Sequence, residues 1–281
     1  MWSKALLINT NQSFGPLMLF GLLIMLTACH INSDISEPKD PGGFTFQRED
    51  TFSCGGTTNT VKIYKHEITG LEFVLLPGNE EIDPFLISRT ETTQGVWLSI
   101  MGTYEWRFGG GVHAYVQEGE DNPAVFITYG DAVSFCKKTN LRLPTESEWM
   151  YACRAGSNAK YFFGDSIDDL DDYAWHCGNA ESAREAYAHR VGLKRPNAFG
   201  LYDIYGNVSE WCGSMPRQGQ QISASNKYVL CGGSYSLFDP NPSGECVDWS
   251  STEIRTEKSA YDGSTWFGFR PACSLLSIKD N

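Results

Sequence analysis

Apolar residues in this chain occur in short runs separated by turn-forming residues, and this pattern predicts small strands and helices. Residues 71–76 (LEFVLL) form an apolar run closed by a Pro-Gly pair, so they are a predicted strand, with residues 84–88 (PFLIS) as the predicted neighbour. Three helices are predicted where apolar positions repeat at helical spacing. From Gly156 onward, turns, aromatic residues and glycines dominate. The fold class predicted is therefore α+β with low regular secondary structure.

Each predicted helix has its own start and stop signals. The first begins after Thr92 or Thr93 and ends at Gly102. The other two begin with capping boxes, in which a threonine accepts a hydrogen bond from a backbone amide and an acidic side chain three residues later reaches back. Gly156 is predicted to end the third helix. The two capping boxes are Thr128 with Asp131 and Thr145 with Glu148.

The N-terminal segment has the pattern of an export signal. Lys4 is the only charged residue before Asp34, and residues 17–26 form an apolar run that is too short to span a bilayer. The run leads into LTAC at residues 26–29, which resembles the lipobox of bacterial lipoproteins, in which the cysteine is lipidated after cleavage. The alternatives are an ordinary secretory signal or a buried apolar segment.

The interpretation as a lipoprotein predicts the domain bounds and the cellular location. Residues 1–28 are the expected signal peptide, Cys29 is the expected lipidation site, and residues 29–43 are a flexible tether to one domain at 44–281. His30 stands where an aspartate would favour retention in the inner membrane. The protein is thus expected in the bacterial cell envelope, held by its lipid at the outer membrane.

Composition and charge narrow the possible partners. The chain has 281 residues, with 22 Lys plus Arg against 34 Asp plus Glu and a net charge of −12. A nucleic-acid partner is not expected, because binding to a duplex needs a basic surface. Hydrophobic residues make up 41% and aromatic residues 13% of the chain, which supports a packed core and excludes disorder for most of it.

The cysteines that follow Cys29 are even in number, which suggests disulfides in an exported protein. They do not form a zinc motif, because no C-x-x-C, H-x-H or H-E-x-x-H spacing occurs. Spacing alone does not assign the pairs. These cysteines are Cys54, Cys136, Cys153, Cys177, Cys212, Cys231, Cys246 and Cys273.

Six motifs follow one another in a fixed order. They are ETTQGVW at 91–97, RLPTESEW at 142–149, YFFGD at 161–165, PNAFGLYDIYGNVSEW at 196–211, GGSY at 232–235 and GFR at 268–270. Their content and order resemble the formylglycine-generating enzyme family, also called sulfatase-modifying factors. The resemblance implies an irregular C-type-lectin-like fold of the formylglycine-generating enzyme type.

The resemblance breaks down at the catalytic positions. Oxidases of this family use two cysteines shortly after the GGSY motif to hold copper and to engage the substrate cysteine. These positions fall on Leu237 and Pro242, whose side chains cannot ligate a metal, and Ser209 replaces a family tryptophan near the oxygen pocket. The resemblance therefore implies no copper site. Cys231 as a relocated thiol and Ser234 are the remaining catalytic candidates, and Ser234 is equally read as a turn hydroxyl.

Calcium is the metal that the resemblance supports. Family members bind calcium in the loop that corresponds to residues 203–210, where Asp203 and Glu210 supply carboxylates and Gly206 and Val208 supply carbonyls. Turn and cap chemistry is the alternative for the two acidic residues. A second site would begin at Asn179, but the segment that should return an aspartate to it is replaced.

The resemblance also implies two disulfides, Cys136–Cys273 and Cys153–Cys246, at positions where exported family members carry structural cysteines. The pairing of Cys54, Cys177, Cys212 and Cys231 stays open.

Three functions from different classes are compatible with these residues. The first is a non-catalytic member of the family that binds a protein or peptide partner or supports an assembly. The second is a divergent oxidoreductase of the family that acts on a protein or peptide. The third is a surface-displayed, diversified ligand-binding protein, because variable proteins on this fold place their variable surface shortly before the GFR motif, and residues 248–266 here are polar and aromatic.

Overall fold

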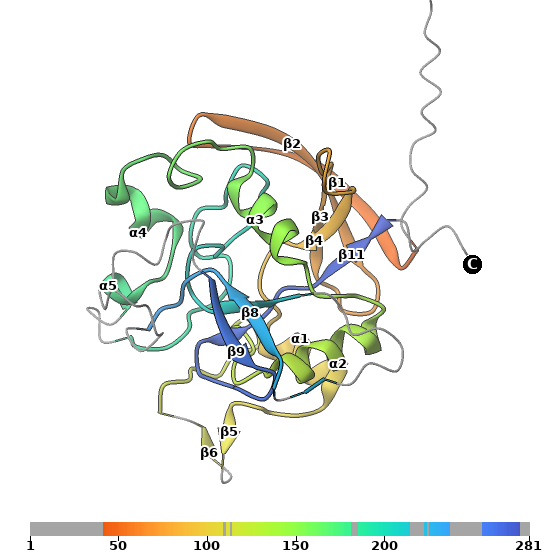
Figure 1. The fold of residues 1–281 in the computed structure, drawn as a ribbon, viewed down its shortest axis with the longest axis vertical. Coiled ribbons are helices and arrows are strands. Elements are labelled where there is room, and N and C mark those ends of the chain that lie inside the picture. The colour runs from red at the N-terminus through yellow and green to blue at the C-terminus, as the bar shows by residue number, and fades with distance from the viewer. Residues whose placement is uncertain are drawn as a thin grey trace, which may run out of the picture. The chain divides into compact units, whose positions relative to one another are not determined.

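The computed structural model describes residues 42–108, 111–112, 114–180, 185–213, 222–223, 225–236 and 255–275. All of them belong to one unit, Lys39–Asn281, and Figure 1 shows the arrangement of its elements. The predicted signal peptide, lipidation site and most of the tether lie outside the described residues. No helix within the described ranges is long and apolar enough to cross a membrane.

A five-stranded antiparallel sheet forms one side of the fold (Figure 1). The two predicted strands are confirmed as neighbours in it, and Val74 lies opposite Ile87. The hairpin that precedes them was not predicted. In sheet order the strands are β1 (Phe44–Cys54), β2 (Thr57–His66), β3 (Glu72–Leu76), β4 (Phe85–Ser88) and β11 (Ala272–Ser274).

A second sheet of four short strands carries several of the motif residues. Its outer strand β10 runs parallel to β7, whereas β7, β8 and β9 pair antiparallel. In sheet order the strands are β10 (Phe267–Gly268), β7 (Ser209–Cys212), β8 (Lys227–Cys231) and β9 (Arg255–Ser259). A separate ribbon is formed by β5 (Arg107–Phe108) and β6 (Gly111–Val112).

The three predicted helices are present, and their caps form as expected. They are α1 (Gln94–Met101), α2 (Tyr129–Thr139) and α3 (Glu146–Arg154). The Thr93 hydroxyl accepts from the Val96 amide, and both capping boxes close in both directions. One boundary differs, because Ala155 takes the left-handed conformation (φ 49°) and ends α3 one residue before Gly156.

Three further short helices lie in the region that was predicted to be mostly turns. They are η1 (Ile167–Asp169), α4 (Leu170–Tyr173) and α5 (Cys177–Ala180). The interior joins the two sheets through α3, whose Trp149 and Cys153 share one apolar cluster with Val74 and Ile87 of the first sheet. Cys212 and Cys231 of the second sheet belong to the same cluster.

The two predicted disulfides are not present in the structure. Cys136, Cys153 and Cys273 are buried free thiols, and Cys246 lies outside the described residues. Cys136 on α2 packs in a different apolar cluster from Cys273, whose thiol donates to the Ser274 carbonyl at 3.7 Å. The Cys153 thiol is hydrogen-bonded to Tyr205 instead.

Of the other four described cysteines, three are free thiols and one is disulfide-bonded. Cys54, Cys212 and Cys231 are also buried free thiols. Cys177 is disulfide-bonded.

Candidate functional site

The sequence motifs meet at a buried ion pair. Arg270 and Glu210 are 0% and 1% exposed, and they form a two-pronged contact in which Arg270 Nε and Nη2 donate to the Glu210 carboxylate at 2.7 and 2.6 Å. Trp149 Nε1 from α3 donates to the same carboxylate at 2.8 Å. The GFR motif, the 196–211 motif and the 142–149 motif are thereby joined at one carboxylate.

Two more motifs are joined to the same loop, one through a second carboxylate and one through a backbone carbonyl. Glu91 is fully buried and accepts from the Val208 amide at 3.2 Å and from Asn207 Nδ2 at 3.1 Å. The Asn207 backbone carbonyl in turn accepts from the Tyr235 amide of the GGSY motif at 3.1 Å. Asn207 has a positive φ of 63°, which asparagine tolerates better than most residues.

The remaining motif joins through an aromatic contact. Tyr205 Oη accepts from the Phe162 amide at 3.0 Å, and their rings stack at 4.6 Å. All six motifs thus converge on the loop 203–211 inside the protein. Their shared role here is to hold the fold, because the residues that join them are buried.

The network holds more negative than positive charge. Glu91, Asp203 and Glu210 surround Arg270, and burial raises the pKa of Asp203 to about 6. Burial also raises the pKa of Glu91 well above its ordinary value, and the neighbouring Asp203 and Glu210 carboxylates act in the same direction. The negative charge of these buried carboxyl groups is therefore stable in the fold only because the Arg270 guanidinium compensates it.

The two carboxylates expected to bind calcium lie at the ends of this loop, where both have other partners. Glu210 is occupied by Arg270 and Trp149. Asp203 Oδ2 accepts from the Gly192 amide at 2.6 Å, and Oδ1 finds no hydrogen-bond partner among the described residues. Asp203 thus keeps one free oxygen, whereas Glu210 already has a cation as partner.

The expected second calcium site is also engaged in local contacts. Asn179 Oδ1 accepts from the His176 amide at 2.9 Å, and Asn179 Nδ2 donates to the Ala174 carbonyl at 2.9 Å. These bonds close the turn before α5. Within the described ranges, no three His, Cys, Asp or Glu side chains are grouped to hold a metal.

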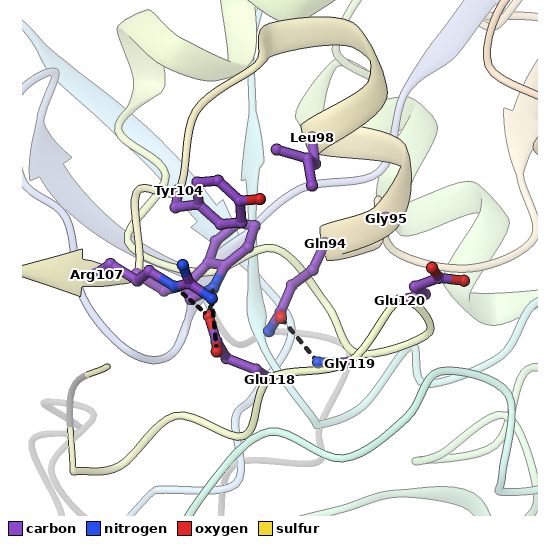
Figure 2. A pocket seen from close by; sticks show the side chains of 9 residues that line it. Gln94, Gly95, Leu98, Tyr104, Arg107, Glu118, Gly119 and Glu120 are labelled. Atoms are coloured by element: carbon purple, nitrogen blue, oxygen red, sulfur yellow. Dashed lines mark hydrogen bonds and ion pairs between the residues drawn. The ribbon is translucent and has the colours of Figure 1, made fainter. Parts of the chain in front are cut away.

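A pocket of about 190 Å³ opens beside the N-terminal end of α1 (Figure 2). Its polar wall is the Glu118 carboxylate, which accepts from Arg107 Nε at 2.5 Å and from Trp106 Nε1 at 2.9 Å. The Arg107 guanidinium also lies 4.3 Å from the centre of the Tyr104 ring. These contacts hold an aromatic and charged wall in place around an open space.

The other side of the pocket is built from α1. Gln94 is buried and bridges to the facing segment, since its Oε1 accepts from the Gly119 amide at 3.1 Å and its Nε2 donates to the Gln117 carbonyl at 2.9 Å. Gly95 approaches Glu120 so closely that an added Cβ would lie 3.0 Å from the Glu120 carbonyl oxygen. Figure 2 shows Glu120 on the opposite side of Gln94 from the ion pair.

Sequence reasoning missed this pocket. Its residues come from three segments that are polar or aromatic without a metal or nucleophile pattern: residues 94–98, 104–107 and 118–120. The available signal was the density of aromatic and charged residues directly after α1.

Comparison with known proteins identifies the family. The model of the sulfatase-modifying factor enzyme 1-like domain matches residues 50–275. The chain belongs to this family. The predicted resemblance and the α+β fold of the family are therefore both confirmed.

The sulfatase-modifying factor-like chain has active and inactive relatives. It is 30% identical to the formylglycine-generating enzyme of Streptomyces coelicolor over 126 residues, 41% of this chain and 39% of that enzyme. It is 32% identical to the inactive C-alpha-formylglycine-generating enzyme 2 of Mus musculus over 183 residues, 63% of this chain and 57% of that protein. The alignments thus span less than two thirds of these relatives.

A solved structure shares the fold. Treponema denticola variable protein 1 superimposes with a TM-score of 0.53 at 24% identity and covers 81% of this chain and 99% of that protein. At this identity the likeness shows the fold alone.

The catalytic candidates of this sulfatase-modifying factor-like chain are placed unfavourably for chemistry. Cys231 is 0% exposed, so a substrate cannot reach its thiol. Ser234 is buried, and its hydroxyl accepts from the Ser236 amide at 3.3 Å, which makes it the turn hydroxyl of the alternative reading. Leu237 and Pro242 lie outside the described residues.

Proposed function

We propose that this chain is a non-catalytic member of the sulfatase-modifying factor family, anchored by lipid in the bacterial cell envelope, that binds a protein or peptide partner. The observation that carries the non-catalytic part is that every free thiol in the described part of the chain is buried. The family positions hold Leu237 and Pro242, and the neighbouring Cys231 is 0% exposed. Thiol-based oxidation of a substrate cysteine needs a thiolate that the substrate can reach.

The α1 pocket supports the binding part. Tyr104 is 41% exposed, and with Leu98 it offers an apolar surface at the pocket. Glu118 is neutralised by Arg107, whereas Glu120 is exposed and forms no ion pair with a described residue. The chain as a whole carries a net charge of −12. A peptide segment with a basic side chain complements this pocket best.

The binding proposal is tested with random peptides displayed on phage and selected on the purified full chain. We expect the enriched peptides to carry Lys or Arg, and Glu120→Lys to weaken their binding at least about tenfold, equivalent to about 1.4 kcal/mol. Glu80→Lys is the matched control, because Glu80 is exposed and does not line the pocket. Enrichment of acidic peptides, or equal binding by the two variants, would contradict the proposal.

A further inference from the structure

The ion pair in the α1 pocket has the geometry of a bound ligand. Arg107 Nε and Nη2 donate to the two oxygens of the Glu118 carboxylate at 2.5 and 2.9 Å. The same guanidinium lies 4.3 Å from the centre of the Tyr104 ring. A carboxylate that accepts two hydrogen bonds beside an aromatic face suits a guanidinium group. The pocket therefore contains an arginine site, which an arginine of the chain itself fills.

The Glu118 half of this site is held in place by the fold. Trp106 is 2% exposed, and its Nε1 donates to the Glu118 carboxylate at 2.9 Å. The buried Gln94 side chain fixes the backbone on both sides of Glu118, because it donates to the carbonyl of the preceding residue at 2.9 Å and accepts from the amide of the following residue at 3.1 Å. These bonds do not involve the arginine, so the carboxylate keeps its position when the ion pair opens.

The Arg107 half of the site is held less firmly. The Arg107 side chain is 42% exposed, and it starts from β5, a strand of two residues that pairs with the two residues of β6. An ion pair with this exposure adds little stability, because water screens it and both side chains lose conformational freedom. Replacing this arginine by one from a partner therefore costs the chain little, while the carboxylate and the aromatic ring still bind a guanidinium.

Glu120 gives the pocket a second acidic group. Its side chain is exposed and forms no ion pair with a described residue. Figure 2 shows Glu120 and Glu118 on opposite sides of Gln94. A basic partner is thus attracted to the pocket before the arginine site opens.

We propose that Glu118 and Tyr104 bind an arginine side chain of the peptide partner, and that Arg107 occupies this position until the partner displaces it. This inference rests on the proposed binding function and specifies its ligand. A lysine ammonium is a point charge that does not form the two-pronged contact with a carboxylate, so arginine is favoured over lysine. Arg107 lowers the affinity of the pocket for a partner arginine, and its removal should raise that affinity.

Two short peptides of equal charge test the arginine site, acetyl-Gly-Arg-Gly-amide and acetyl-Gly-Lys-Gly-amide. Their binding to the purified full chain is followed by NMR through the indole N–H signal of Trp106, because this group bonds directly to Glu118. The signal is assigned as the one missing from the spectrum of Trp106→Phe. This readout is local, so it reports on the pocket and not on other acidic surfaces of a chain with a net charge of −12.

Arg107→Met empties the site and leaves the carboxylate and the ring in place. We expect it to bind the arginine peptide at least about tenfold more tightly than the wild type does, equivalent to about 1.4 kcal/mol, and to gain less for the lysine peptide. Adding Glu118→Gln should remove the gain. Arg107→Lys keeps the charge without the two-pronged contact, and it should give a smaller gain in the same direction.

Arg195→Met is the matched control, because it removes the same charge from an exposed ion pair elsewhere. Arg195 is 68% exposed, pairs with Asp172 at 3.1 Å and does not line the pocket. The melting temperatures of all variants are compared with that of the wild type, to confirm that each is folded.

Three results would overturn the proposal. If Arg107→Met does not bind the arginine peptide more tightly, the pair with Glu118 is an ordinary surface ion pair. An equal gain for the lysine peptide, or an equal gain in Arg195→Met, would show an effect of net charge alone. The proposed function fails on a different result, enriched phage peptides that are acidic or indifferent to Glu120, so the two failures can be told apart.

Discussion

Removing the Arg270 side chain is the most severe single test of the buried network. In Arg270→Met, Glu210 loses its two charged hydrogen bonds at 2.6 and 2.7 Å, and Asp203 and Glu91 lose the cation that compensates them. The Tyr202 carbonyl, which accepts from Arg270 Nη2 at 2.8 Å, also loses its donor. Methionine has an unbranched apolar side chain, so loss of the charge rather than of bulk dominates.

The magnitude follows from burial. Breaking a buried ion pair by removing one partner costs about 3–5 kcal/mol, and Arg270 and Glu210 are 0% and 1% exposed. For a domain of this size each kcal/mol shifts the melting temperature by about 2–4 °C. Arg270→Met should therefore melt about 6–20 °C below the wild type.

Thermal unfolding followed by circular dichroism measures this shift. Arg48→Met is the matched control, because the Arg48 side chain is 43% exposed and its ion pairs with Asp50 and Glu72 should contribute less than about 1 kcal/mol. Adding Glu210→Gln to Arg270→Met should recover part of the loss, since no unpaired Glu210 charge then remains. A folded Arg270→Met protein that melts with the wild type would refute the reasoning.

Three other predictions concern pH, calcium and lipid. In the folded protein the pKa of Asp203 is about 6, above its ordinary 3.8. The stability that protonated Asp203 provides is therefore fully present below about pH 4 and is lost as the pH rises through about 6. The free energy of unfolding measured in urea should fall over this pH range in the wild type and fall less in Asp203→Asn. Because Arg270 already holds Glu210, the melting temperature should be the same in calcium as in chelator. A melting temperature that rises in calcium, with the rise abolished in Asp203→Ala, would instead support a calcium site in this loop. Cys29→Ala should leave the protein soluble or unprocessed, and unchanged partition into membranes with unchanged mass would rule out lipidation.

Features determined by near neighbours could be predicted from the sequence. A capping box involves residues three apart, so Thr128 with Asp131 and Thr145 with Glu148 were identified correctly. The β1–β2 hairpin was missed because β1 is largely polar and exposed and the first half of β2 is polar as well. The signal for it was Gly55-Gly56 between the strands, where Gly55 has a φ of 55°.

Features that join distant residues could not be predicted. The resemblance implied a calcium role for Glu210, and nothing in its local sequence indicated its partner Arg270, which lies 60 residues further along the chain. The α1 pocket likewise brings together residues 94–98 and 118–120, which touch only after folding.

The absence of formylglycine formation is the central claim, and mass spectrometry of a substrate peptide tests it most directly. The purified full chain would be supplied with Cu(I), oxygen and a peptide that contains the sulfatase motif Cys-x-Pro-x-Arg, beside an active formylglycine-generating enzyme as positive control. Because the resemblance places Leu237 and Pro242 at the positions of the family cysteines and Cys231 is buried, the peptide cysteine should stay unconverted at the level of the metal-only control. Conversion above that control would contradict the account. Loss of that conversion in Cys231→Ala would identify Cys231 as the thiol responsible.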